Sequence, residues 1–173
     1  MSKYRKLYDQ EYGKKVEFTV FIIHGLSPEL YKVERFIKDE LRFNTTILQT
    51  SFTGKIILNK FKDEIWDNAT CAVAIMSPDD KLDSGNYRAR QNVFFELGYC
   101  QAVFDSYCED EDEELESEPV IIIKEKTIDF QDVSDLLGLE YLSYTNGTIE
   151  STFHSLGKAL NNLYYELGGE EDA

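Results

Sequence analysis

The sequence predicts an α/β protein with a flavodoxin-like three-layer fold around a five-stranded parallel sheet. Its 173 residues suit one domain, and an apolar content of 42% is enough for a core. Short apolar runs also alternate with segments that are apolar at every third or fourth residue. Such alternation is typical of βαβ units, and right-handed crossovers leave few strand orders. We expect the flavodoxin-like order.

Five apolar runs account for the strands of this sheet. The first alternates and then becomes continuously apolar, as a strand buried on both faces does. The expected strands are 16–23, 45–48, 71–76, 119–123 and 141–144.

The segments between these strands have apolar residues at every third or fourth position, which predicts helices. Ser27 is a candidate N-cap and Pro28 suits the first helical position. The expected helices have apolar residues at Leu30, Val33, Ile37 and Leu41, at Ile57, Phe61 and Ile65, across 89–104, and at Phe153, Leu156, Leu160, Leu163 and Leu167. A further, short helix is expected around 133–137.

The domain organisation is simple. We expect a polar lead-in over 1–15, one domain over 16–168 and a tail over 169–173. No second, sensing domain is evident, which leaves two alternatives: a separate sensor protein supplies the activating signal, or the chain is a domain of a larger protein.

The net charge of −15 is concentrated in one insertion of that domain. Residues 105–118 hold nine acidic residues and no basic one, and such runs are typical of solvated loops. A solvated loop is therefore favoured over a partner-binding or metal-binding segment, since the spacing and central glycine of a calcium loop are absent. We expect no metal site.

Composition also excludes several partners. An acidic surface repels the phosphate backbone, which argues against nucleic-acid polymers. No stretch approaches the roughly 20 apolar residues of a membrane span, and the three cysteines form no C-x-x-C pair. We expect a cytoplasmic protein with reduced thiols and no membrane contact.

The predicted sheet locates a ligand crevice between its first and third strands. Ligands of open α/β sheets lie beyond the carboxyl ends of the strands, where the strand order reverses, and two polar loops, 24–27 and 77–88, meet there. The helix that follows points its N-terminus at the crevice. Arg88 and Arg90 could bind a diphosphate, or they could pair with Asp79, Asp80 and Asp83; the sequence leaves both interpretations open.

Glu96 breaks the pattern of its helix. At about 100° per residue, it falls at the edge of the apolar arc, with Asn92 one turn earlier. Burying an unpaired charge is costly, so a functional acid here should have a perturbed pKa and a defined partner. The alternative is a glutamate that reaches solvent or pairs with an arginine. The position of the helix beside the crevice favours function.

Several strings resemble the TIR-like nucleotide-binding domains of bacteria, relatives of the Toll/interleukin receptor domain found in anti-phage signalling systems with cyclic-nucleotide sensors. The most specific is Arg-Ala-Arg-Gln-Asn-Val-Phe-Phe-Glu-Leu-Gly-Tyr over 88–99. Phe-Thr-Val-Phe-Ile-Ile-His-Gly over 18–25, Gly-Lys over 54–55 leading to Phe61, and Ser-Pro-Asp-Asp over 77–80 add to it. The resemblance covers about half of the chain, from Phe18 to Phe104.

The resemblance implies NAD⁺ glycohydrolase activity, with NAD⁺ as substrate, no cofactor, and self-association that completes the pocket. Glu96 matches the catalytic glutamate of the family. His24, Gly25, Arg90 and Asn92 match positions that line the nucleotide pocket or flank that glutamate, and Asp79 and Asp80 of the matching 77–80 string are further substrate-binding candidates.

Three departures from the family pattern concern gating and self-association more than chemistry. The loop before the second helix has one glycine where two are common, Asn59 stands where glutamate is frequent, and the acidic run is longer than expected.

One carboxylate is sufficient for the implied reaction. Most glycosidases need two acids because the leaving oxygen must be protonated, whereas nicotinamide leaves NAD⁺ as a neutral pyridine. An ionised Glu96 can stabilise the oxocarbenium-like transition state electrostatically. The product would be ADP-ribose or a cyclic form of it.

Other functions remain to be weighed against this one. The main alternative is a non-catalytic nucleotide-binding or scaffolding module, and a nucleoside ribosyltransferase would also use a pocket glutamate. A phosphoacceptor receiver domain needs an acidic pair after the first strand, which His24–Ser27 lacks. The frame of a Walker phosphate loop is absent around Gly54.

Overall fold

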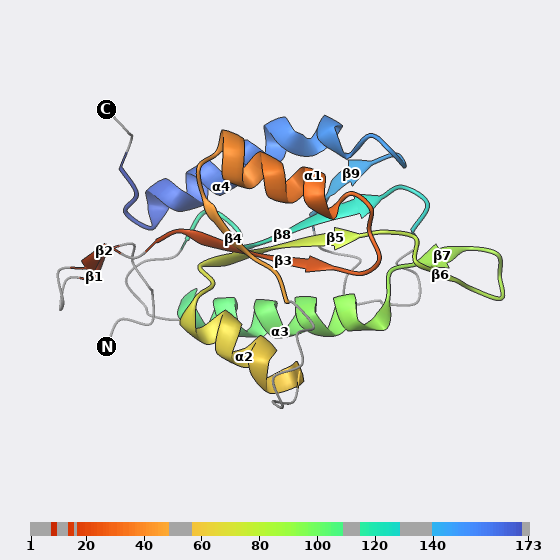
Figure 1. Ribbon diagram of the computed structural model, residues 1–173, viewed down its shortest axis with the longest axis horizontal. Coiled ribbons are helices and arrows are strands. Elements are labelled where there is room, and N and C mark those ends of the chain that lie inside the picture. Colours follow the sequence, from red (N-terminus) through yellow and green to blue (C-terminus); the bar gives the residue numbers. More distant parts are fainter. Residues whose placement is uncertain are drawn as a thin grey trace.

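A computed structural model (Figure 1) describes residues 8–9, 14–15, 17–48, 57–108, 115–128 and 140–170, with the backbone alone at 8–9, 14–15, 57 and 105–108. Its centre is a five-stranded sheet in the order β4-β3-β5-β8-β9. All four strand pairs are parallel, which confirms the predicted α/β flavodoxin-like fold. The strands are β3 (Thr19–His24), β4 (Asn44–Thr46), β5 (Cys71–Met76), β8 (Val120–Glu125) and β9 (Leu142–Tyr144).

The strand order reverses between β3 and β5. From β3 the chain moves outward to β4 at the edge, then returns across β3 to β5 and on to β8. His24 pairs with Ile75, so β3 and β5 end within one residue of each other. The loops after these two strands therefore leave the same end of the sheet, as the sequence predicted.

One face of the sheet packs against α1 (Leu30–Arg35), the π-helical turn η1 (Phe36–Glu40) and α4 (Phe153–Glu166). Successive side chains of a strand point to opposite faces of the sheet, so every second residue of each strand faces these helices. Its core includes Val20 and Ile22 of β3, Val73 and Ile75 of β5, Val33 and Ile37 of the first helix, and Leu156, Leu160 and Leu163 of α4.

The opposite face packs against α2 (Ile57–Asp67) and α3 (Gln91–Cys108), which lie together below the sheet in Figure 1. Phe21, Ile23, Ala72 and Ala74 of the strands meet Phe61 and Ile65 of α2 and Val93, Leu97, Cys100 and Phe104 of α3. The third-or-fourth-residue spacing thus identified the buried faces of both helices.

A short hairpin follows β5, where the sequence predicted only a loop. Strands β6 (Asp80–Lys81) and β7 (Tyr87–Arg88) pair antiparallel, and they project at the end of the sheet where α3 begins (Figure 1). A second antiparallel pair, β1 (Tyr8–Asp9) with β2 (Lys14–Lys15), lies within the predicted polar lead-in.

Several boundaries differ from the prediction. The first helix begins at Leu30, after a turn in which the Glu29 N–H donates to Ser27 Oγ at 3.2 Å. The third begins at Gln91 and continues to Cys108, so its last turn takes up the first residues of the acidic run. β8 extends two residues further than expected, to Glu125. The predicted short helix at 133–137 and the Gly54 loop lie outside the described residues.

Candidate functional site

Gly25, Asp79 and Arg90 meet at the corner where β3 and β5 end. A Cβ atom built on Gly25 would lie 1.9 Å from Asp79 Oδ2 and 3.4 Å from Arg90 Cγ. Gly25 follows β3, Asp79 follows β5, and Arg90 immediately precedes α3. The structure therefore brings together three of the predicted site residues from three separate segments.

Hydrogen bonds of Asp79 join the two loops at this corner. The Leu26 N–H donates to Asp79 Oδ2 at 3.2 Å, and the Ser77 hydroxyl donates to Oδ1 at 2.8 Å. The Asp79 N–H lies 3.1 Å from the Arg88 carbonyl oxygen. These contacts connect the loop after β3, the loop after β5 and the hairpin.

The two arginines have different surroundings. Asp80 and Arg88 are cross-strand partners on the hairpin, and Arg88 Nε lies 4.0 Å from Asp80 Oδ2, at the outer limit of an ion pair. Arg90 is exposed, with its aliphatic stem beside Gly25. The predicted pairing with an acid thus describes Arg88, while Arg90 lies at the corner, where an anion could approach the start of α3.

His24 is the last residue of β3 and is partly exposed. Its Nδ1 lies 2.9 Å from the carbonyl oxygen of Gly25. A carbonyl oxygen only accepts, so Nδ1 is the donor in this hydrogen bond. The imidazole therefore sits beside the corner with its orientation set by its own loop.

Glu96 lies along α3, between apolar neighbours. Val93, Leu97 and Cys100 of the same helix are buried, while Glu96 is partly buried. Burial raises the pKa of Glu96 to about 7, and a hydrogen bond with the Asn92 side chain acts in the opposite direction. Desolvation disfavours the charged form, so the carboxylate is poised to titrate near neutral pH.

The neighbouring thiol reflects the same environment. Burial raises the pKa of Cys100 to about 12, and the charge of Glu96 adds to this effect. On the other side of Glu96 in the helical projection lie Phe95 and Tyr99, which contact Phe61 of α2 with ring centroids 6.2 and 5.1 Å away. Glu96 is thus an acid between a core and an aromatic cluster.

Helix α3 begins at Gln91, directly after Arg90. At 3.6 residues per turn, Glu96 therefore lies in the second turn of the helix that begins beside the corner. Asn92 lies between Arg90 and Glu96 along the chain, and Asp80 remains on the hairpin.

Residues 19–146 match the family model described as "CAP12/Pycsar effector protein, TIR domain". This match covers well over half of the chain. The chain belongs to this family. The match confirms the predicted resemblance to TIR-like domains of anti-phage signalling effectors.

A relative of this TIR domain occurs in Escherichia coli (strain K12), where it is called "Uncharacterized protein YuaY". The two are 37% identical over 93 residues, which cover 50% of this chain and 30% of YuaY. The chain thus matches less than a third of that relative's length.

Sequence reasoning missed two partners of Asp79 in the TIR domain, namely the Leu26 N–H and the Ser77 hydroxyl. Leu26 is separated from Asp79 by 53 positions, so the hydrogen bond exists only once β3 and β5 are paired. Ser77 belongs to the Ser-Pro-Asp-Asp string over 77–80, and this string was the sequence signal that could have identified Ser77 as a site residue.

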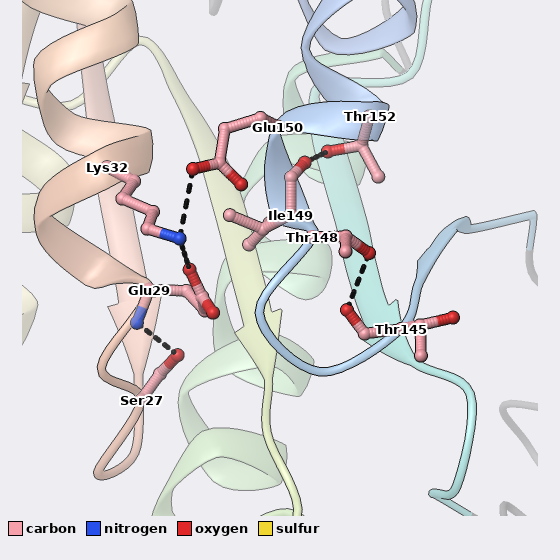
Figure 2. Close-up of polar contacts among 8 residues, drawn as sticks. All are labelled: Ser27, Glu29, Lys32, Thr145, Thr148, Ile149, Glu150 and Thr152. Atoms are coloured by element: carbon pink, nitrogen blue, oxygen red, sulfur yellow. Dashed lines mark hydrogen bonds and ion pairs between the residues drawn. The ribbon is translucent and has the colours of Figure 1, made fainter.

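A polar network on the α1 side was also missed (Figure 2). Lys32 Nζ lies 2.9 Å from Glu29 Oε2 and 2.9 Å from Glu150 Oε1 of the 3-10 turn η3 (Ile149–Thr152). Glu29 is 5% exposed. In the sequence, Glu29 and Lys32 resemble an ordinary surface pair three residues apart, whereas in the fold they join α1 to the segment before α4.

Within the described part of the chain, no group of three or more His, Cys, Asp or Glu side chains has an arrangement that could hold a metal ion. Among its helices, none is long and apolar enough to cross a membrane.

Proposed function

We propose that this TIR domain is an NAD⁺ glycohydrolase that cleaves the nicotinamide–ribose bond and yields nicotinamide and ADP-ribose or a cyclic form of it. Glu96 is the catalytic residue of this proposal. His24, Gly25, Arg90 and Asn92 belong to the substrate site with Asp79 and Asp80, and NAD⁺ is consumed as a substrate without a cofactor.

The observation that carries the proposal is the environment of Glu96. Burial of this acid beside Val93, Leu97 and Cys100 outweighs its hydrogen bond with Asn92 and raises its pKa to about 7. Strongly perturbed acids in a cleft are typical of active sites. Membership of a TIR effector family supports the same choice, because the proposal takes Glu96 to be the catalytic glutamate that the resemblance implies.

The reaction needs charge stabilisation more than proton transfer. The bond between ribose C1′ and the pyridinium nitrogen breaks, and its electron pair leaves with neutral nicotinamide. Positive charge develops on the ribose ring, where an ionised Glu96 stabilises it in a medium poorer in water than bulk solvent. A water molecule, or for a cyclic product a nitrogen of the adenine, then bonds to C1′. Water loses a proton to solvent in the hydrolytic case.

The corner at Gly25 suits the phosphate-bearing part of the substrate. Arg90 can bind a diphosphate with charge-assisted hydrogen bonds, and the free N–H groups at the start of the 18-residue helix α3 favour anions. In this proposal the nicotinamide ribose lies near Glu96, in the second turn of the same helix.

Activation belongs to the same proposal. Membership of a Pycsar effector family supports a response to a nucleotide signal. We propose that the signal, received by a separate sensor protein or by another part of a longer chain, drives self-association of TIR domains and thereby switches on cleavage.

The decisive experiment compares the wild type with Glu96→Gln at high protein concentration, with NAD⁺ as substrate and released nicotinamide as readout. The substitution preserves the size of the side chain and removes its charge, so we expect a loss of at least about a hundredfold. Glu118→Gln, at an exposed acid, is the matched control and should retain the wild-type rate.

Equal rates in the wild type and Glu96→Gln would exclude Glu96 as the catalytic residue. NAD⁺ binding by calorimetry without nicotinamide release, even in the assembled state, would instead support a non-catalytic binding or scaffolding module. The mass of the product distinguishes linear from cyclic ADP-ribose.

A further inference from the structure

Asp79 is held by protein donors on both of its carboxylate oxygens. Ser77 donates to Oδ1 at 2.8 Å, and Leu26 donates its N–H to Oδ2 at 3.2 Å. Ser77 is 3% exposed, so its hydroxyl fixes Asp79 from the protein side. The carboxylate in turn fixes the loop after β3.

Gly25 makes this arrangement possible by leaving space. Its Cβ would lie 1.9 Å from Asp79 Oδ2 and 3.0 Å from Asp79 Cγ, well inside contact distance. Gly25 is not among the residues with positive φ, so backbone conformation does not require a glycine here. The requirement is steric, and it is imposed by the Asp79 carboxylate.

The backbone of Asp79 is tied down as well. Its N–H lies 2.8 Å from the carbonyl oxygen of Ser77 and 3.1 Å from that of Arg88. Asp79 thereby connects the end of β5, the hairpin that precedes α3, and the loop from His24 to Ser27. An acid with these contacts controls where that loop lies.

We propose that Asp79 is a positioning residue whose carboxylate clamps the His24–Ser27 loop onto the end of β5, so that the loop is set to receive the nucleotide. In this inference Asp79 belongs to the substrate site by acting through Leu26 and Gly25 rather than by contact with the nucleotide, which refines its predicted role as a substrate-binding residue. The inference rests on the proposed function only in that the nucleotide is taken to be NAD⁺.

The first test measures the clamp without any ligand. Hydrogen exchange of the Leu26 amide should become about tenfold faster or more in Asp79→Ala, because its acceptor is removed. Ser77→Ala should accelerate the same amide by a smaller factor. Asp83→Ala, at an exposed acid in the hairpin turn, is the control and should leave the amide unchanged. Unchanged exchange in Asp79→Ala would overturn the clamp.

The second test is a double-mutant cycle on NAD⁺ affinity, measured by calorimetry in the Glu96→Gln background so that NAD⁺ is not consumed. Gly25→Ala and Asp79→Ala each break the same clamp, and each should raise the Kd about tenfold. The combined variant should be no worse than Asp79→Ala alone. Multiplied effects would mean independent contacts with the nucleotide and would overturn the proposal.

Ser77→Ala separates positioning from direct contact. Its buried hydroxyl reaches the nucleotide only through Asp79, so the Kd for NAD⁺ should rise in this variant too, and Ser77→Ala combined with Asp79→Ala should match Asp79→Ala. An unchanged Kd in Ser77→Ala, with a raised one in Asp79→Ala, would show direct contact and overturn the proposal. If Gly25→Ala does not fold, Ser77→Ala and Asp79→Ala provide the double-mutant cycle on the Kd instead.

Failure of this inference is distinguishable from failure of the proposed function. Nicotinamide release by the wild type and Glu96→Gln reports on the reaction alone. The Leu26 amide and the Kd in the Glu96→Gln background report on the clamp, whether or not the wild type cleaves NAD⁺.

Discussion

Two acids with little solvent exposure, Glu125 at the end of β8 and Glu96 on α3, differ in their hydrogen bonds. Glu125 is 2% exposed, deeper than Glu96. It accepts hydrogen bonds from the Thr127 N–H at 2.8 Å, the Thr127 hydroxyl and the Asn146 N–H at 3.2 Å. For Glu96, burial dominates over its bond with Asn92 and raises its pKa to about 7.

The two acids differ in what their hydrogen bonds do for the fold. A carboxylate that accepts several N–H and O–H groups holds the segments that donate them. Glu125 joins the turn after β8 to the loop after β9 in this way. At Glu96, the bond with Asn92 does not offset burial, so the environment of its carboxylate costs stability.

The largest effect on stability should come from removing the well-bonded acid. Glu125→Ala leaves two N–H groups and one hydroxyl without their acceptor, and hydrogen bonds to charged groups contribute more than neutral ones. We expect a loss of about 2–3 kcal/mol in the free energy of unfolding, measured by urea denaturation. The exposed Glu118→Ala should change it by less than about 0.5 kcal/mol. Equal small losses in both variants would contradict the structural role of Glu125.

The sequence predicted most of the fold because the information was local. Continuous apolar runs such as Cys71–Met76 identified buried strands. Helical spacing identified the buried face of α3, and Glu96 lies at the edge of that face. The order of the strands followed from handedness rules. Glu96 itself could be singled out because its neighbours in the helix are also neighbours in the sequence.

The rest depended on contacts between distant segments. The bond from Leu26 to Asp79 joins residues 53 positions apart, and nothing local distinguishes Asp79 from Asp80. Glu125 lay beyond the apolar run that marked its strand, and its partner Asn146 is 21 positions away. Pairing of Asp80 with Arg88 converted an expected loop into a hairpin. Such partners are fixed by the assembled sheet, not by short-range pattern.

A smaller effect, of opposite sign, is expected when the poorly bonded acid is neutralised. The pKa of Glu96 is about 7 in the folded protein, against an ordinary value of 4.5. Below the ordinary value the carboxyl is protonated in both states, and there is no penalty. As pH rises to about 7 the unfolded state ionises first, so folding stability falls, and above the folded pKa the full penalty applies.

Glu96→Gln should therefore stabilise the protein at about pH 8 by about 1–2 kcal/mol, allowing for solvent screening of a partly exposed group. The gain should shrink to less than half at about pH 5 and nearly vanish at about pH 3.5, and urea denaturation at these pH values measures it. Together with the loss in Glu125→Ala, this gives the two acids effects of opposite sign. A destabilising Glu96→Gln at the highest pH would contradict this contrast between them.

The smallest effect should come from removing the Asn92 side chain that hydrogen-bonds Glu96. The Asn92 bond lowers the pKa of Glu96, so Asn92→Ala should raise it further. Because the ionised form is the active one in our proposal, nicotinamide release at NAD⁺ concentrations well below KM, which reports the ligand-free protein, rises with pH around a midpoint of about 7 in the wild type. In Asn92→Ala the midpoint moves to higher pH. Gln91→Ala, at an exposed neighbouring amide, should keep the wild-type midpoint, whereas a downward shift in Asn92→Ala would mean that Asn92 does not stabilise the charge of Glu96.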